Sequence, residues 1–201
     1  MMNIPQDPRK LRARIRSYER KLEREKIEYG YYRDGAGKRY MLAPLYLLMG
    51  DLDGALKSLQ WFERAFSDDG GEPGHRLCWA FALYRSGDMG KAVQMLRKAM
   101  LLNLYMLPEL LGIAKHQLDI WHGSNWEEPE YIEWIPPEYF ALWDEQARAW
   151  AKSVYESAEF RQVEARYVEI HHELKDLRPG PRRTQLVNEA SALMRGRSQT
   201  A

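Results

Sequence analysis

Apolar residues recur every three or four positions through most of the 201-residue chain, and this spacing predicts helices rather than strands. The first helix is expected over residues 8–29, with polar and mainly basic residues on its other face. Asp7 before Pro8 is typical of a helix start, and Gly30 is typical of a helix end. The apolar positions of this helix are Leu11, Ile15, Tyr18 and Leu22.

The chain repeats itself after 37 residues, which is the strongest organising signal in the sequence. In both copies a glycine can close one helix in the left-handed conformation, and the following aspartate can cap the next helix. Small alanines recur where two helices must cross closely. The pattern predicts two helical hairpins over residues 39–103, with Pro44 bending the first helix. The matched pairs are Arg39 and Arg76, Ala43 and Ala80, Gly50 and Gly87, Asp51 and Asp88, Ala55 and Ala92, and Leu59 and Leu96.

The rest of the chain is also expected to be helical apart from one long irregular stretch. A short helix is predicted over 102–114, where Pro108 kinks or delays it, and residues 119–137 show no clean periodicity. Further helices are predicted over 137–143, 144–156 and 157–177, with a last one around 186–194. No segment predicts a strand, so the expected fold class is all-α.

Residues 39–103 resemble tetratricopeptide repeats, which share the small residue of the first helix, the Gly-Asp turn and the alanine of the second helix. The period of 37 departs from the usual value of about 34. The resemblance implies a groove, lined by the first helices, that holds a peptide. The alternative is that the C-terminal half of the chain buries the same residues. The implied lining is Tyr40, Pro44, Leu47 and Leu48, followed by Leu77, Phe81, Tyr84 and Arg85.

Taken together, these patterns divide the chain into three parts. Residues 1–36 form a basic amphipathic helix and loop, and residues 37–116 form the repeat region, a short α-solenoid. Residues 117–201 form an aromatic, acidic loop and C-terminal helices that pack on the repeats. Two repeats are fewer than a solenoid needs, so both flanks are expected to cap the stack.

The irregular stretch is a second candidate binding site because five of the seven tryptophans lie between residues 121 and 150. A long irregular segment rich in aromatic residues is typical of a recognition loop. The alternative is an internal plug that lies over the repeats and fills their groove. The candidate anchors are Trp121, Trp126, Tyr131 and Trp134.

Charge is segregated along the chain although the net charge is only +1. Residues 1–39 carry 12 Lys/Arg against 6 Asp/Glu, whereas residues 119–177 carry 5 against 14. A basic helix can bind nucleic acid, but its glutamates interrupt the positive face, and the helix can instead cap the array or pair with the acidic region. The start lacks a leader pattern, no stretch is apolar enough for a membrane span, and Cys78 lies in an apolar run, so a cytoplasmic protein is expected.

The histidines and acids do not have the spacing of a known catalytic or metal site. Asp119 and His122 lie near several glutamates, and His171-His172 lie between two more, but neither set has the H-E-x-x-H spacing. We therefore expect a non-catalytic scaffold or adaptor that binds a protein or peptide, with no cofactor and no metal. The alternative function is a nucleic-acid-associated regulator that uses the basic N-terminal helix.

Overall fold

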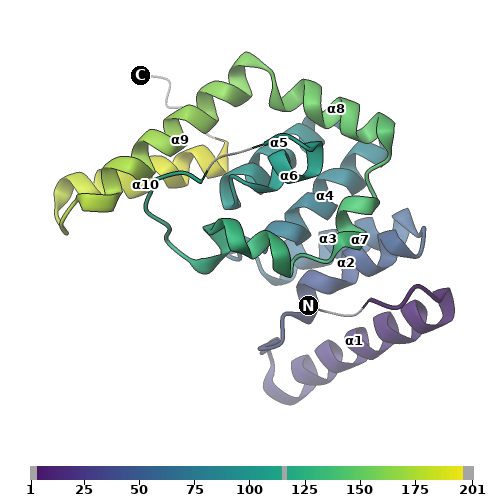
Figure 1. Ribbon diagram of the computed structural model, residues 1–201. Helices are drawn as coiled ribbons and strands as arrows, with labels where there is room; N and C mark the ends of the chain where they lie inside the picture. The colour runs from purple at the N-terminus through teal and green to yellow at the C-terminus, as the bar shows by residue number, and fades with distance from the viewer. Residues whose placement is uncertain (1–3, 115–116, 197–201) are drawn as a thin grey trace.

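The computed structural model describes residues 4–114 and 117–196, and this part of the chain consists of helices and loops without a β-strand (Figure 1). The chain is therefore all-α, as predicted. Within the same residues, no helix combines the length and the hydropathy that a membrane span requires. The helices are α1 (Pro8–Tyr29), α2 (Lys38–Leu48), α3 (Leu52–Ala65), α4 (Pro73–Arg85), α5 (Met89–Leu102), α6 (Met106–Leu111), the 3-10 helices η1 (Asn125–Glu127) and η2 (Pro129–Trp134), α7 (Pro137–Ala141), α8 (Glu145–Tyr155), α9 (Ala158–Asp176) and α10 (Pro181–Arg195).

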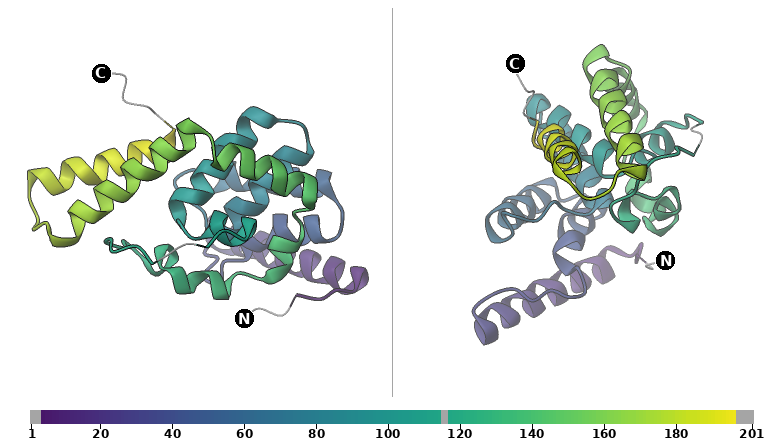
Figure 2. Two further views of the ribbon diagram at one scale, coloured as in Figure 1. Left: turned by 45° about the horizontal axis from the view of Figure 1, so that its top comes forward. Right: turned by 90° about the vertical axis from the view of Figure 1, so that its left-hand side faces the viewer.

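Helix α1 begins and ends where the sequence predicts. The Asp7 side chain accepts hydrogen bonds from the Arg9 amide at 2.7 Å and the Lys10 amide at 3.2 Å, and Gly30 ends the helix in the left-handed conformation with φ of 76°. Its buried residues are Leu11, Ile15 and Leu22, and the helix packs on α2. Figure 2 shows α1 lying along one side of the helical body.

Helices α2 and α3 form one helical pair, and α4 and α5 form the next, with α4 packed against both helices of the first pair. The turns between the paired helices follow the repeated sequence. Gly50 and Gly87 have φ of 77° and 82°, and the aspartates that follow them cap α3 and α5. Asp51 accepts from the Gly54 amide at 2.7 Å, and Asp88 accepts from the Lys91 amide at 3.3 Å.

Close packing within the pairs depends on four alanines at matched positions of the repeat. Ala43, Ala55, Ala80 and Ala92 are all completely buried. A larger side chain at these positions would push the helices apart, because well-packed interiors leave no room for extra methylene groups. Pro44 lies inside α2 without dividing it into two helices.

Two segments differ from the prediction in their helix boundaries. The short helix expected over 102–114 is present but starts later and ends earlier, because α5 ends at Leu102 and α6 covers only Met106–Leu111. Asn103 causes this break: its side-chain oxygen accepts from the Tyr105 amide at 3.0 Å, a local bond that competes with helix continuation. Likewise, the helix that starts at Pro137 ends at Ala141 rather than at Trp143.

The loop between the two helical pairs is held by the matched arginines of the repeat. Arg39 donates from Nε to the Asp69 carboxylate at 2.8 Å, and the Tyr40 hydroxyl donates to the same group at 2.7 Å. From α4, Arg76 donates to the backbone carbonyls of Asp69 at 3.1 Å and Gly70 at 2.8 Å. We call this arrangement the Asp69 clamp, since it ties the first turns of α2 and α4 to one loop.

The C-terminal half covers the two pairs. Helix α7 packs on α2 and α4, α8 packs on α6, and α9 and α10 form a hairpin against α5 that extends from the body (Figure 1). Arg148 on α8 joins these layers, because its guanidinium donates to the carbonyls of Trp143 at 2.8 Å, Phe140 at 2.7 Å and Leu110. Three carbonyls from two other segments thus converge on one side chain.

Two glycines that lie three residues apart provide a matched test of the turn. Gly87→Ala should lower the free energy of unfolding by about 1–2 kcal/mol, because alanine is strained at a φ of 82°. Gly90 lies in α5 with open space around it, so Gly90→Ala should raise the free energy of unfolding by about 0.5–1 kcal/mol through helix propensity. Urea denaturation of both variants checks this; a Gly87→Ala variant as stable as the wild type would contradict the turn assignment.

Candidate functional site

The face formed by the first helices of the two pairs is covered by the C-terminal half. Phe81 packs on Trp143 with ring centroids 5.4 Å apart, and Tyr84 stacks on Trp150 at 4.7 Å. Arg85 forms an ion pair with Asp144 at 3.0 Å. Of the other residues that the sequence places in a groove, Pro44, Leu47 and Leu77 are buried and Leu48 is partly buried, while Tyr40 lines the hollow described below. Apart from Tyr40 and from Arg85, whose side chain is 47% exposed, these side chains therefore face the interior of the chain.

Within residues 119–137, which we call the aromatic loop, η1 and η2 lie over the beginnings of α2 and α4. The Asn103 side-chain amide donates to the backbone carbonyls of Trp126 at 2.8 Å and Glu128 at 3.0 Å, which fixes the course of η1 and η2. The Trp126 ring meets Tyr40 edge-on, with centroids 6.2 Å apart. On the α4 side, the Tyr131 hydroxyl donates to Glu72 at 2.9 Å.

This placement creates a hollow, which we call the aromatic pocket, between the loop and the starts of α2 and α4. Its volume is about 570 Å³, within the range of small-molecule and peptide sites. Tyr40, one of the groove residues expected from the sequence, lines this hollow together with three of the candidate loop residues. Trp134 is 66% exposed and stands at the rim. The residues that define the pocket are Arg33, Tyr40, Glu72, Trp126, Tyr131 and Trp134.

One wall of the pocket is held rigidly by Asp34. This buried carboxylate accepts from the backbone amides of Lys38 and Arg39, both at 2.8 Å, and so caps α2 from a position before the helix. Arg39 lies between Asp34, at 3.1 Å, and Asp69, at 2.8 Å. Burial raises the pKa of the neighbouring Tyr40 hydroxyl, and its bond to Asp69 raises it further. Tyr40 is therefore a neutral, oriented donor rather than a base.

Glu72, the acidic group of the aromatic pocket, has a structural role. It caps α4 by accepting from the amides of Gly74 at 3.0 Å and His75 at 2.7 Å, and it also accepts from Tyr131. Burial raises the pKa of the Glu72 carboxyl, while these three hydrogen bonds oppose the shift. Because its oxygens are already used, the carboxylate orients Tyr131 and the first turn of α4.

Trp121, the fourth aromatic residue of the candidate loop, lies elsewhere. Its amide donates to the carbonyl of His171 at 3.0 Å, and the Arg183 guanidinium lies 4.9 Å from its ring centroid. Trp121 therefore joins the hairpin of α9 and α10. The acid and histidine candidates are also dispersed: Asp119 pairs with Lys175, and the described residues contain no cluster of three or more potential metal ligands.

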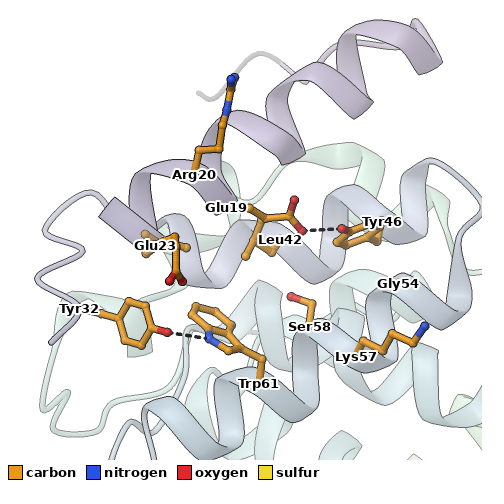
Figure 3. Close-up of a pocket in the computed structure, with 11 residues that line it drawn as sticks. Glu19, Arg20, Glu23, Tyr32, Leu42, Tyr46, Gly54, Lys57, Ser58 and Trp61 are labelled. Carbon is orange, nitrogen blue, oxygen red and sulfur yellow. Dashed lines mark hydrogen bonds between the residues drawn. The ribbon is translucent and has the colours of Figure 1, made fainter. Parts of the chain in front are cut away.

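A second hollow, which we call the helix groove, lies between α1 and α3 with α2 as its floor (Figure 3). Its volume is about 550 Å³. Tyr46 donates to Glu19 at 2.5 Å, and the Trp61 indole donates to the Tyr32 hydroxyl at 3.2 Å, so the aromatic side chains of its walls are held by one another and by α1. Sequence reasoning did not identify this groove.

The repeat itself contains the signal for the helix groove. In the 37-residue repeat, Trp79 of α4 corresponds to Leu42 of α2. Leu42 lines the floor of the helix groove. Trp79 is buried, with its ring 6.0 Å from Phe62 and 4.7 Å from the Arg76 guanidinium. The matched position holds a leucine on the groove floor in the first pair and a larger, buried tryptophan in the second. A mismatch of size between matched positions was thus visible in the sequence.

His75 lies beneath the aromatic pocket in a cluster of rings. It is completely buried, and its ring centroid lies 4.7 Å from Phe62, 5.6 Å from Tyr40 and 5.7 Å from Trp79. Neither ring nitrogen has a hydrogen-bond partner among the described residues. Burial lowers the pKa of His75 to about 3, and the nearby Arg76 charge acts in the same direction. The imidazole therefore packs as a neutral ring at neutral pH.

Comparison with known proteins identifies no relative: no family model, no curated protein and no solved structure matches this chain.

Replacing His75 should change how stability depends on pH. The unfolded chain binds a proton at His75 near pH 6.5, whereas the folded chain does not until about pH 3, so this residue removes stability as the pH falls below 6.5. Between pH 7.5 and pH 5 the wild type should therefore lose about 2 kcal/mol more of its free energy of unfolding than His75→Phe does. Urea midpoints at the two pH values measure this difference. If the free energy of unfolding depends on pH equally in both proteins, His75 takes up its proton at the same pH in the folded and the unfolded chain, which would contradict its packing as a neutral ring.

Proposed function

We propose that this protein is a non-catalytic scaffold that binds another protein, and that the aromatic pocket is its binding site. In this proposal α2–α3 and α4–α5 act as a tetratricopeptide-like pair of hairpins that displays the pocket at one end. The observation that carries the proposal is the convergence of Tyr40, Trp126, Tyr131 and Trp134 on one hollow. Tryptophan, tyrosine and arginine are the residue types that contribute most to protein interfaces.

The aromatic pocket is favoured over the face of the first helices because its anchor residue is accessible. Phe81 is covered by Trp143, whereas Trp134 is 66% exposed at the pocket rim. It is also favoured over the helix groove, whose aromatic side chains are already tied by internal hydrogen bonds. An exposed indole beside an oriented floor can be buried by a partner without breaking an existing bond.

The chemistry of the pocket favours a short extended peptide with an apolar anchor side chain. The anchor would enter between the rings of Trp126, Tyr131 and Trp134, and extended segments commonly dock on grooves lined by such rings. Arg33 lies at the same hollow with an exposed side chain, so an acidic residue next to the anchor would find a partner there. The anchor side chain of such a peptide would contact the aromatic rings, and its acidic residue would pair with Arg33.

A catalytic role is not part of the proposal, because the ionisable groups of the pocket already have structural partners. Glu72 caps α4, and Arg39 lies between two aspartates. In active sites, by contrast, a base or nucleophile lies within reach of a substrate and remains free to exchange protons.

Peptides selected from a random library on the immobilised full-length protein should lose at least tenfold in affinity when Trp134 is replaced by alanine. The reason is that truncating a tryptophan anchor removes most of its buried contact with the ligand. Met89→Ala is the matched control, because Met89 is also exposed, at 41%, but lies at the start of α5. Fluorescence polarisation of labelled peptides gives the affinities.

Both variants should keep the wild-type melting temperature within about a degree, since exposed substitutions away from structural features change stability little. The proposal fails if the selected peptides bind the Trp134→Ala protein as well as the wild type. It also fails if no peptide is enriched on the protein over the bare support.

A further inference from the structure

The charged residues of α1 separate into two sets once the helix is packed. Its glutamates partly face the body: Glu19 accepts from the Tyr46 hydroxyl at 2.5 Å, and Glu25 accepts from the Asp34 amide at 2.8 Å and from Lys38 at 3.3 Å. In the sequence these acids interrupt the positive face. In the folded chain Glu19 and Glu25 direct their charge toward α2 and the loop before it, while Glu23 and Glu28 stay exposed.

Four arginines of α1 point the other way. At 100° per residue, Arg9, Arg16, Arg20 and Arg24 fall within an arc of about 80° opposite the buried face of the helix. All four are exposed, and none forms an ion pair with any of the described residues. They extend over roughly 22 Å of helix, with the last three one turn apart. Arg20 also borders the helix groove, and Figure 3 shows its guanidinium extended away from Tyr46 and Trp61.

The arginines near the C-terminal end behave differently. Arg182 is paired with Glu173 at 2.6 Å, and Arg183 donates to the carbonyls of Leu174 at 2.8 Å and Leu177 at 3.0 Å. These basic residues fold back on their own hairpin. The outward arginines of α1, which have no ion pairs within the described part of the chain, therefore form a positive surface that Arg182 and Arg183 near the other end of the chain do not.

Two exposed tyrosines lie at the C-terminal end of α1. Tyr29 is the last residue of the helix and falls on the same side as Leu11, whereas Tyr31 lies beyond the helix. Tyr29 and Tyr31 are 40% and 59% exposed, and their ring centroids lie 6.4 Å apart. The Arg33 guanidinium lies 4.8 Å from the Tyr29 ring centroid, and Ile27 is 77% exposed nearby in the sequence. A row of cations followed by an open ring combines the two elements that bind single-stranded nucleic acid.

We propose that the outward face of α1 binds single-stranded nucleic acid, with Arg9, Arg16, Arg20 and Arg24 on the phosphates and Tyr31, beyond the end of the helix, stacking on a base. Phosphate contacts of this kind are independent of sequence, and every base offers a face for stacking. A membrane surface fits less well. An interfacial helix places its apolar face in lipid, whereas the apolar face of α1, with Leu11, Ile15 and Leu22, is buried against α2.

The test measures binding of a labelled 20-nucleotide single strand to the full-length protein by fluorescence anisotropy at several salt concentrations. The triple variant Arg16→Ala, Arg20→Ala, Arg24→Ala should bind at least tenfold more weakly at low salt. The plot of log affinity against log salt should become shallower by about 2, since each phosphate contact contributes about 0.7 on a single strand. The control triple Lys91→Ala, Lys152→Ala, Arg178→Ala removes the same charge from exposed positions on other elements and should bind like the wild type.

Tyr31→Ala separates stacking from attraction by charge alone. It should weaken binding of the single strand at least fivefold while changing binding of the corresponding duplex less than twofold. Trp134→Ala should bind the single strand normally, so this proposal and the peptide proposal can fail separately. Equal affinities of the two triple variants would overturn the proposal. Absence of binding at low salt would do so too, as would arginine-dependent binding to phosphatidylserine vesicles without binding to the single strand.

Discussion

The aromatic pocket depends on the Asp69 clamp, which fixes the first turns of α2 and α4 relative to each other. Arg39 and Tyr40 reach the Asp69 carboxylate from α2, and Arg76 reaches the backbone of the same loop from α4. Burial raises the pKa of Asp69, but hydrogen bonds from the Gly71 amide, Tyr40 and Arg39 outweigh this effect and leave the pKa below its usual value. The carboxylate is thus stabilised in its charged form, and the arginines stay near it because leaving a half-buried charge unpaired is unfavourable.

The positions of the pocket residues follow from this clamp and from the packing above it. Tyr40 belongs to the clamp and forms the floor of the aromatic pocket, and Glu72 follows the clamped loop directly and orients Tyr131. Two helical pairs expose more apolar surface than a short chain can leave in water, so the C-terminal half covers the rest of the first-helix face with Trp143 and Trp150. One end of that face remains open as the pocket, while α1 covers α2 from the other side and keeps its arginines in solvent.

Much of the fold could be predicted from local chemistry. The Gly-Asp turns, the Asp7 cap and the buried alanines are encoded by residues a few positions apart, and the structure contains them all. The site was less predictable, because Tyr40 and Trp126 are 86 positions apart and only the course of the loop brings their rings to 6.2 Å. The Asn103 side chain that directs this course gives no signal in the sequence beyond a helix break. The direction of Glu19 and Glu25 was equally hidden, since it depends on which face of α1 meets Tyr46 and Asp34.

The most direct test of this account is hydrogen–deuterium exchange of the Asp69→Ala protein compared with the wild type. If the clamp positions the pocket, backbone amides of residues 72–77 and 125–134 should exchange faster, while those of α9 over residues 158–176 should keep their wild-type rates. The free energy of unfolding should fall by about 2–4 kcal/mol, because Arg39 loses a half-buried partner. Unchanged exchange in 125–134, or an equal increase throughout the chain, would show that the aromatic loop is positioned independently of Asp69.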